Sequence, residues 1–186
     1  MDTSSIIVIA AAAALLFFLL HTYNRLVRLR NKVRNAWSDI DVTLERRHDL
    51  VPGLVETVRG YMAHERETLE NVTRARAEAV SSGGSNVAAR AAAELALTGA
   101  IGNVFAKVEN YPALRAAENM QLLQEQLTST ENRIAFARQC YNDFVREYNT
   151  ALATFPRNLI AGALGFSPAG LFEAEETSRV NVQVKV

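Results

Sequence analysis

The stretch NMQLLQEQLTSTENRIAFARQCYNDFVREYNTALATF, residues 119–155, decides the fold class of this chain. Apolar or small side chains recur along it in alternating steps of four and three, with one polar member: Leu123, Leu127, Thr130, Ile134, Ala137, Tyr141, Phe144, Tyr148, Ala151 and Phe155. A repeat of about 3.5 residues is typical of helices packed in a coiled coil or a four-helix bundle. We therefore predict one long helix here, with Asn119 as its N-cap and Pro156 just beyond its end.

Three stretches upstream repeat this spacing. Their apolar positions are Leu26, Val33, Trp37, Ile40 and Leu44, then Leu54, Val58, Tyr61, Leu69 and Val72, then Val87, Ala91, Leu95, Thr98, Ile101, Phe105 and Val108. Breaks are expected near residues 49–52, 81–85 and 110–119, where proline, glycine or asparagine interrupts the pattern. The predicted fold is all-α, with a long antiparallel four-helix bundle over residues 25–155 and with Trp37 buried in it.

The first of these breaks is ambiguous. Asp49 could be an N-cap with Pro52 in the first turn of a new helix, which would make residues 49–52 a hairpin. Pro52 could instead kink one very long helix. We favour the hairpin because it gives helices of comparable length that can cover one another.

The N-terminal region predicts a membrane anchor over residues 1–24. Residues 3–24 contain no Asp, Glu, Lys or Arg, and about twenty such residues span a bilayer as a helix. The chain starts without basic residues and lacks a small-residue cleavage site, so we favour an uncleaved anchor over a signal peptide. The residues expected in the lipid include Ile6, Ile9, Leu15, Phe17, Phe18 and Leu20.

The charges that flank the anchor predict its orientation. Five basic residues and no acidic ones follow it closely: Arg25, Arg28, Arg30, Lys32 and Arg34. The positive-inside rule then places the N-terminus outside and the helical bundle in the cytoplasm, in a single-pass arrangement.

Composition argues against several functions. Lys and Arg total 20 and Asp and Glu total 20, so the chain lacks the basic excess of nucleic-acid-binding proteins. His64-Glu65 begins like a zinc-binding HExxH motif, but Thr68 replaces the second histidine. Cys140, the single cysteine, lies on a helix predicted to be packed, which favours a buried, unreactive thiol. We predict no catalytic, cofactor-binding or metal-binding residues.

Charged side chains beside the apolar seams have two interpretations. Glu131 and Arg138 flank the seam of the last helix, and Asp41, Glu45, Arg46 and Arg47 flank that of the first. Such residues usually pair between helices and set their register, so we predict that Glu131 and Arg138, with Asp49 as a cap, have structural roles. A polar ligand pocket within the bundle is the alternative.

The C-terminal part divides at residue 172. Residues 156–172 are apolar, with Arg157 as the single charge, and are too interrupted by Gly and Pro to span a bilayer. We expect them either to contact the membrane interface or to cover the end of their own bundle. Residues 173–186 comprise an acidic lead-in and a strictly alternating segment whose apolar positions are Val180, Val182, Val184 and Val186.

The alternating segment predicts a β-strand. An isolated strand is unstable, so these residues are either disordered or paired with the same strand of other copies. We favour pairing, which makes the four valines a predicted oligomer interface.

Three segments carry a family resemblance: YNRLVRLRNKVRNAWSDIDV (23–42), RRHDLVPGLVETVRGYMAHE (46–65) and TENRIAFARQCYND (130–143) with YN at 148–149. Together they resemble the LemA family of bacterial membrane proteins over nearly the whole chain. The resemblance implies an N-terminal anchor and an α-helical bundle, and no established catalytic activity. Members often look to be encoded beside membrane proteases, which hints at a partner role. The tail after Phe172 departs from the family pattern.

These observations lead to one expected function and one alternative. We expect a non-enzymatic scaffold that binds no cofactor and assembles with copies of itself at the bacterial inner membrane. Its partners would be the lipid bilayer and further copies of the chain, and not nucleic acid. The alternative is an adaptor for another membrane protein, such as a membrane protease.

Overall fold

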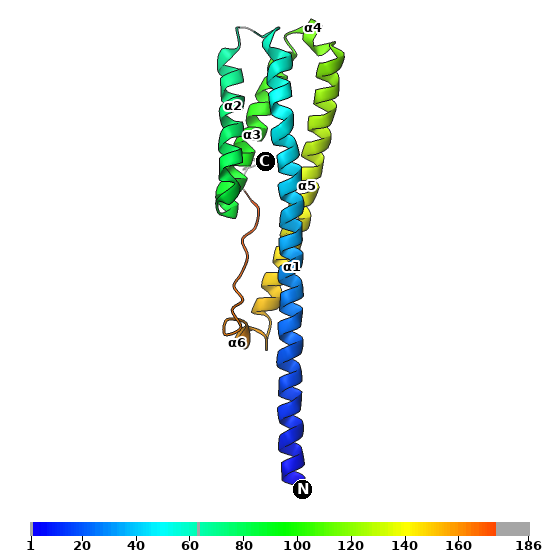
Figure 1. The fold of residues 1–186 in the computed structure, drawn as a ribbon, viewed down its shortest axis with the longest axis vertical. Helices are drawn as coiled ribbons and strands as arrows, with labels where there is room; N and C mark the ends of the chain where they lie inside the picture. Colours follow the sequence, from blue (N-terminus) through cyan, green and yellow to red (C-terminus); the bar gives the residue numbers. More distant parts are fainter. Residues whose placement is uncertain (1, 63, 174–186) are drawn as a thin grey trace, which may run out of the picture. The chain divides into compact units, whose positions relative to one another are not determined.

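The computed structural model describes residues 2–62 and 64–173. Their helices are α1 (Thr3–Arg59), α2 (Arg66–Ser81), a 3-10 turn η1 (Ser82–Gly84), α3 (Val87–Val108), α4 (Pro112–Arg115), α5 (Glu118–Ala153) and α6 (Asn158–Ala161), as Figure 1 shows. Within these ranges the chain is all-α and contains no strand. The strand predicted for residues 180–186 lies outside the described residues.

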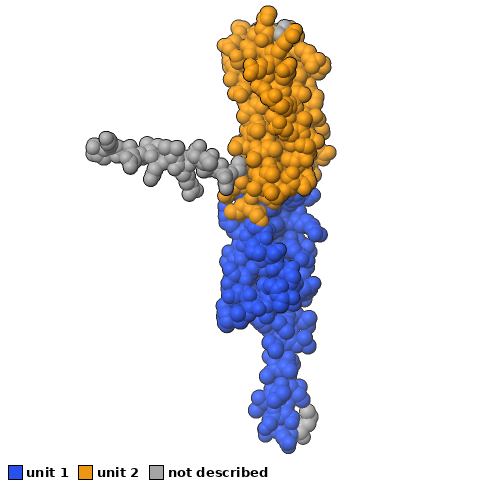
Figure 2. All heavy atoms as spheres, turned by 90° about the vertical axis from the view of Figure 1, so that its left-hand side faces the viewer, with its two compact units in different colours: residues 1–38, 140–169 blue, residues 39–139, 170–186 orange. Residues whose placement is uncertain are grey.

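The chain divides into two compact units, coloured separately in Figure 2. Unit 1 comprises residues 1–38 and 140–169, and unit 2 comprises residues 39–139 and 170–186. Because α1 and α5 each contribute to both units, the same two helices build two different environments.

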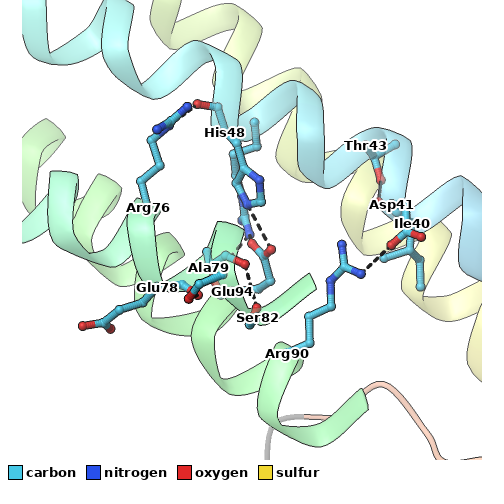
Figure 3. Close-up of polar contacts among 12 residues, drawn as sticks. Ile40, Asp41, Thr43, His48, Arg76, Glu78, Ala79, Ser82, Arg90 and Glu94 are labelled. Atoms are coloured by element: carbon cyan, nitrogen blue, oxygen red, sulfur yellow. Dashed lines mark hydrogen bonds and ion pairs between the residues drawn. The ribbon is translucent and has the colours of Figure 1, made fainter. Parts of the chain in front are cut away.

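The predicted hairpin at residues 49–52 is wrong. Helix α1 continues through Pro52 to Arg59, and Asp49 lies exposed in mid-helix, so it cannot be an N-cap. Proline lacks the N–H that would bond to the carbonyl four residues earlier, which is that of His48. Arg76 of α2 replaces this donor, with its Nε 2.6 Å from the His48 oxygen (Figure 3). The neighbouring helix therefore satisfies the carbonyl that proline frees, and α1 ends only at Arg59.

The other two predicted breaks are confirmed, because α2 ends at Ser81 and residues 109–117 separate α3 from α5. Helix α3 begins where the Asn86 side chain accepts a hydrogen bond from the Ala89 amide at 2.8 Å, which is an N-cap. Pro112 occupies the first turn of α4, where no intrahelical N–H is needed. Helix α5 already includes Asn119, so that residue is not its cap.

The hydrophobic core of unit 2 draws on helices α1 to α5. Val51, Leu54 and Val58 of α1 pack with buried residues of the other helices and connections: Met62, Val72, Ala75, Ala79, Leu97, Ile101, Val104, Val108, Leu114, Met120 and Leu127. The predicted core register of α3 is partly wrong: Leu95 is 57% exposed while Leu97 is buried, and Val104 is buried where Phe105 was expected.

Aromatic contacts characterise unit 1. The rings of Trp37 on α1 and Tyr141 on α5 lie 5.2 Å apart between centroids. Trp37 is only half-buried, and the fully buried neighbour on its helix is Ala36, so the predicted burial of Trp37 is wrong. Burial raises the pKa of Tyr141, and it also raises that of Tyr148 against the opposing charge of Arg30.

Both long helices change register once. Among the buried positions on α1, one series advances by three and four except around Ile40, where two steps of four follow each other: Leu26, Leu29, Val33, Ala36, Ile40, Leu44, Arg47, Val51, Leu54 and Val58. The same double step occurs on α5 at Ala137, Tyr141 and Val145. A four-residue insertion of this kind locally unwinds a coiled coil. It explains why Val145 is buried where the regular repeat predicts Phe144.

Candidate functional site

The N-terminal part of α1 is the first candidate site. Its most apolar window has no residue buried, and the side chains of Ile6, Ile9, Leu15, Phe17 and Leu20 are at least half exposed. Phe18 is half-buried. Helix α3 is also long and apolar enough to cross a membrane, but part of its surface lies in the core of unit 2. The candidate membrane segment is therefore in α1.

A basic collar follows this segment on the same helix. Five cationic residues within ten positions are all exposed: Arg25, Arg28, Arg30, Lys32 and Arg34. Arg30 lies over the Phe166 ring at 5.1 Å, and Lys32 lies over the Phe144 ring at 5.5 Å. Basic groups beside an apolar helix are attracted to anionic lipid headgroups.

Residues 156–169 pack against the helices of unit 1. The Asn149 amide holds the Ala169 backbone at both of its polar groups, donating to the carbonyl and accepting from the N–H, each at 2.9 Å. Phe166 meets Tyr23 of α1 edge to face, with 5.7 Å between ring centroids. Ala161 and Phe166 are buried, so this segment covers part of its own unit.

The second candidate site is a buried polar cluster in unit 2. Arg47 of α1 is 2% exposed and forms ion pairs with Glu94 of α3 and, at 2.7 Å, with Glu131 of α5. Its guanidinium also donates to the Thr98 hydroxyl at 2.7 Å. One arginine thereby ties together α1, α3 and α5, with the buried Glu94 on one terminal nitrogen and the partly exposed Glu131 and Thr98 on the other.

Glu94 is the acceptor at the centre of this cluster. Its second carboxylate oxygen accepts from His48 Nε2 at 3.0 Å, as Figure 3 shows, so that nitrogen carries the hydrogen. Burial alone would raise the pKa of Glu94. The hydrogen bonds from His48 and Arg47, together with their charges, outweigh burial and hold this pKa below its usual value. Glu94 is therefore an ionised, fully engaged carboxylate rather than a proton donor.

A second buried arginine lies nearby on α3. Arg90 pairs with Asp41 of α1 at 2.6 Å, and its side chain is 9% exposed (Figure 3). The pairing of Asp41 with a neighbouring helix follows the pattern expected for charges beside the seams. Arg138 of α5 lies over the Phe172 ring at 5.4 Å.

Sequence reasoning missed Arg90, Glu94 and His48, although a signal for two of them exists. Arg90 and Glu94 are the only charged residues between Val87 and Ala106, and they continue the four-and-three spacing of Leu97, Ile101, Val104 and Val108. A charged residue in a core register predicts a buried ion pair. Arg47 shows the same signal on α1, between Leu44 and Val51.

The ionic cluster of unit 2 offers few groups that could bind a metal ion or transfer a proton. The carboxylates of the cluster are held by arginines, and the described residues contain no group of three His, Cys, Asp or Glu suited to a metal ion. Cys140 is half-buried on α5, rather than fully buried as expected. The predicted interface valines Val180, Val182, Val184 and Val186 lie outside the described residues.

These observations define a class: an all-α protein with a long, apolar, exposed N-terminal helix and an ionic cluster among its helices. A profile of the LemA family matches residues 36–186. The chain belongs to the LemA family.

Curated relatives agree with this assignment. Protein LemA of Metamycoplasma hominis is 26% identical over 163 residues, covering 86% of this chain and 72% of that protein. Magnetosome protein MamQ 2 of Paramagnetospirillum magneticum is similar at 26% identity over 179 residues, and magnetosome protein MamQ of Magnetospirillum gryphiswaldense at 26% over 178. The matches cover 83% of this chain but 66% and 65% of those magnetosome proteins, so this chain spans just under two thirds of their length.

Proposed function

We propose that this chain is a membrane-anchored, non-enzymatic helical-bundle protein that assembles with copies of itself at the bacterial inner membrane. The observation that carries the proposal is the contrast along α1. In its first part, no described residue of the most apolar window is buried, and its later part is held in a core by buried ion pairs. An apolar helix without protein contacts is stable in lipid and not in water.

The absence of an enzymatic role is supported by how the buried polar groups are used. Within residues 2–62 and 64–173, the strongest cluster pairs each buried carboxylate with arginine or histidine. Such a cluster fixes the register of helices and leaves no free base or nucleophile. The relatives include magnetosome proteins, and a structural role of this chain in a comparable assembly needs no catalytic group.

Self-assembly rests on the period-two valines of residues 180–186. The test is the size of the purified full-length protein in detergent, measured by light scattering after gel filtration. Truncation after Thr177, or Val182→Pro with Val184→Pro, should dissociate the oligomer while helical content is retained. Asn181→Thr with Gln183→Thr is the matched control, because it keeps the alternation and should keep the size.

Two results would contradict this role. If the truncated and full-length proteins have the same oligomeric size, the valine segment is not the junction. If a foreign membrane protein copurifies in fixed stoichiometry and the chain itself is monomeric, the adaptor function replaces self-assembly.

The orientation needs a separate experiment. The basic collar predicts that the N-terminus is outside and the bundle is in the cytoplasm. A reporter fused after Val186 should be active only if it works in the cytoplasm. Phosphatase activity from a periplasm-dependent reporter at this position would reverse the topology.

A further inference from the structure

One face of the last turns of the uncharged part of α1 is covered by protein. Side chains up to Phe17 are exposed, whereas Phe18 and Leu19 are half-buried and Thr22 is 1% exposed. Within unit 1, the part that can cover them is residues 140–169. Thr22 and Tyr23 fall at the end of the uncharged stretch, immediately before Arg25. Protein that packs here therefore lies at the depth where the hydrocarbon of a bilayer gives way to headgroups.

The covering segment has an inner side that is fixed. Phe166 packs on Tyr23 and under the Arg30 guanidinium, while Asn149 holds the Ala169 backbone. Ala161 in α6 is 4% exposed. These contacts hold residues 156–169 beside the start of the basic collar.

The start of this segment, together with the preceding Phe155, has an outer side that nothing in the described chain covers. Phe155 is 73% exposed and Leu159 is 69% exposed, close together in sequence on either side of Arg157. We call Phe155 and Leu159 the apolar tip. Large apolar groups next to a cation are typical of segments that enter the interface of an anionic membrane.

We propose that the apolar tip inserts into the interfacial region of an anionic phospholipid bilayer, as a second membrane contact beside the anchor. This inference rests on the proposed function, because it requires α1 to span that bilayer. Two observations select lipid as the occupant. The tip belongs to a segment packed on the residues that end the apolar stretch, and Arg25, Arg28 and Arg157 supply charges that complement lipid phosphates.

The anchor makes this second contact favourable. Once α1 is inserted, the tip is confined near the membrane surface, so its entry is an intramolecular event with a high effective concentration. Two contacts on one unit would also limit how far that unit can tilt about the anchor, which a single helix does not.

The experiment uses the full chain in vesicles of phosphatidylglycerol and phosphatidylcholine that contain brominated lipids. In a Trp37→Phe background, Phe155→Trp and Leu159→Trp each place one tryptophan at the tip. Phe136→Trp is the matched control, because Phe136 is also a phenylalanine with a largely exposed side chain, 69% exposed, but lies within α5. We expect bromines near the headgroup end of the acyl chain to quench the tip tryptophans several-fold more than the control, with helical content unchanged.

The outcomes separate the two proposals. If the protein floats with the vesicles but neither tip tryptophan is quenched more than Phe136→Trp, the tip proposal is overturned and the anchor stands. If a tip tryptophan is shielded from both bromolipid and aqueous acrylamide, another copy of the chain covers the tip, which also overturns the proposal. If the protein fails to float with the vesicles, the anchor and the tip contact fall together.

Discussion

Unit 1 and unit 2 use charge in opposite ways although α1 and α5 contribute to both. In unit 1, Lys32 pairs with Glu147 at 3.4 Å while about half of each side chain is exposed. In unit 2, Arg47 and Glu94 are 2% and 4% exposed and share hydrogen bonds with their neighbours. An exposed pair contributes little because water solvates both charges, whereas a buried pair leaves a costly unpaired charge when one partner is removed. Unit 2 should therefore tolerate substitutions of its charged residues far less well than unit 1.

The largest expected effect is at Arg47. Arg47→Ala leaves Glu94 buried without its main partner and should lower the free energy of unfolding by about 3–5 kcal/mol. The neighbouring Arg46→Ala is the control, and because Arg46 is exposed the change should stay within about 0.5 kcal/mol. The measurement is denaturant unfolding of the full chain in detergent, followed by circular dichroism. Equal effects of the two variants would remove the distinction between the units.

The second prediction concerns Pro52 and Arg76. Arg76→Ala removes the donor to the His48 carbonyl that Pro52 leaves free, and should cost about 1–3 kcal/mol. In a Pro52→Ala background the helix supplies its own N–H at that position, so the same substitution should cost clearly less. The double-mutant cycle measures this coupling. Additive effects would show that Arg76 does not compensate for the proline.

A smaller effect should follow from the titration of Glu94. Its pKa is lowered in the folded protein, so the unfolded chain binds more protons once the pH approaches the ordinary carboxyl range of about 4–5. The stabilisation is present above that range and is lost as the pH falls through the lower, folded-state pKa. The stability difference between the wild type and Glu94→Gln should thus shrink as the pH falls from neutral through and below the ordinary carboxyl range. If the stability difference between the two proteins does not change as the pH falls, the lowered pKa of Glu94 is contradicted.

The smallest effect should be at Lys32 in unit 1. Lys32→Ala removes the exposed pair with Glu147 and the contact with the Phe144 ring, and should cost about 0–1 kcal/mol. The cost should fall further in high salt, which screens exposed charges. A loss comparable to that of Arg47→Ala would mean that unit 1 depends on its charges as strongly as unit 2.

The two units also differ in how far sequence reasoning reached. The spacing of apolar residues correctly indicated helices in both, because helical periodicity is a local property of the chain. It failed at the double four-residue steps around Ile40 and Tyr141, since Phe144 and Val145 are both apolar and only packing decides which one is buried. It also failed at Pro52, whose freed carbonyl is satisfied by Arg76 on another helix.

The candidate sites were predictable to different degrees. The candidate membrane segment was evident from the absence of charge over residues 3–24. Glu131 was expected to have a structural role, and it lies against Arg47, but the central Glu94 was not anticipated. Pairing between helices depends on which faces meet, and this information is distributed over residues far apart in the chain. The inner and outer sides of residues 156–169 likewise depend on contacts such as that between Asn149 and Ala169.

By itself, the sequence determined that the chain is helical, that its first part is apolar enough for a membrane, and that it resembles the LemA family. These properties follow from local composition and periodicity, which do not depend on the rest of the fold. Only the tertiary structure decided where α1 ends, which register each helix buries, and that Arg47 joins three helices through Glu94 and Glu131. The reason is physical. The carbonyl that Pro52 leaves free, a buried charge and the backbone of a loop such as that at Ala169 are stable only when a distant segment supplies the missing partner.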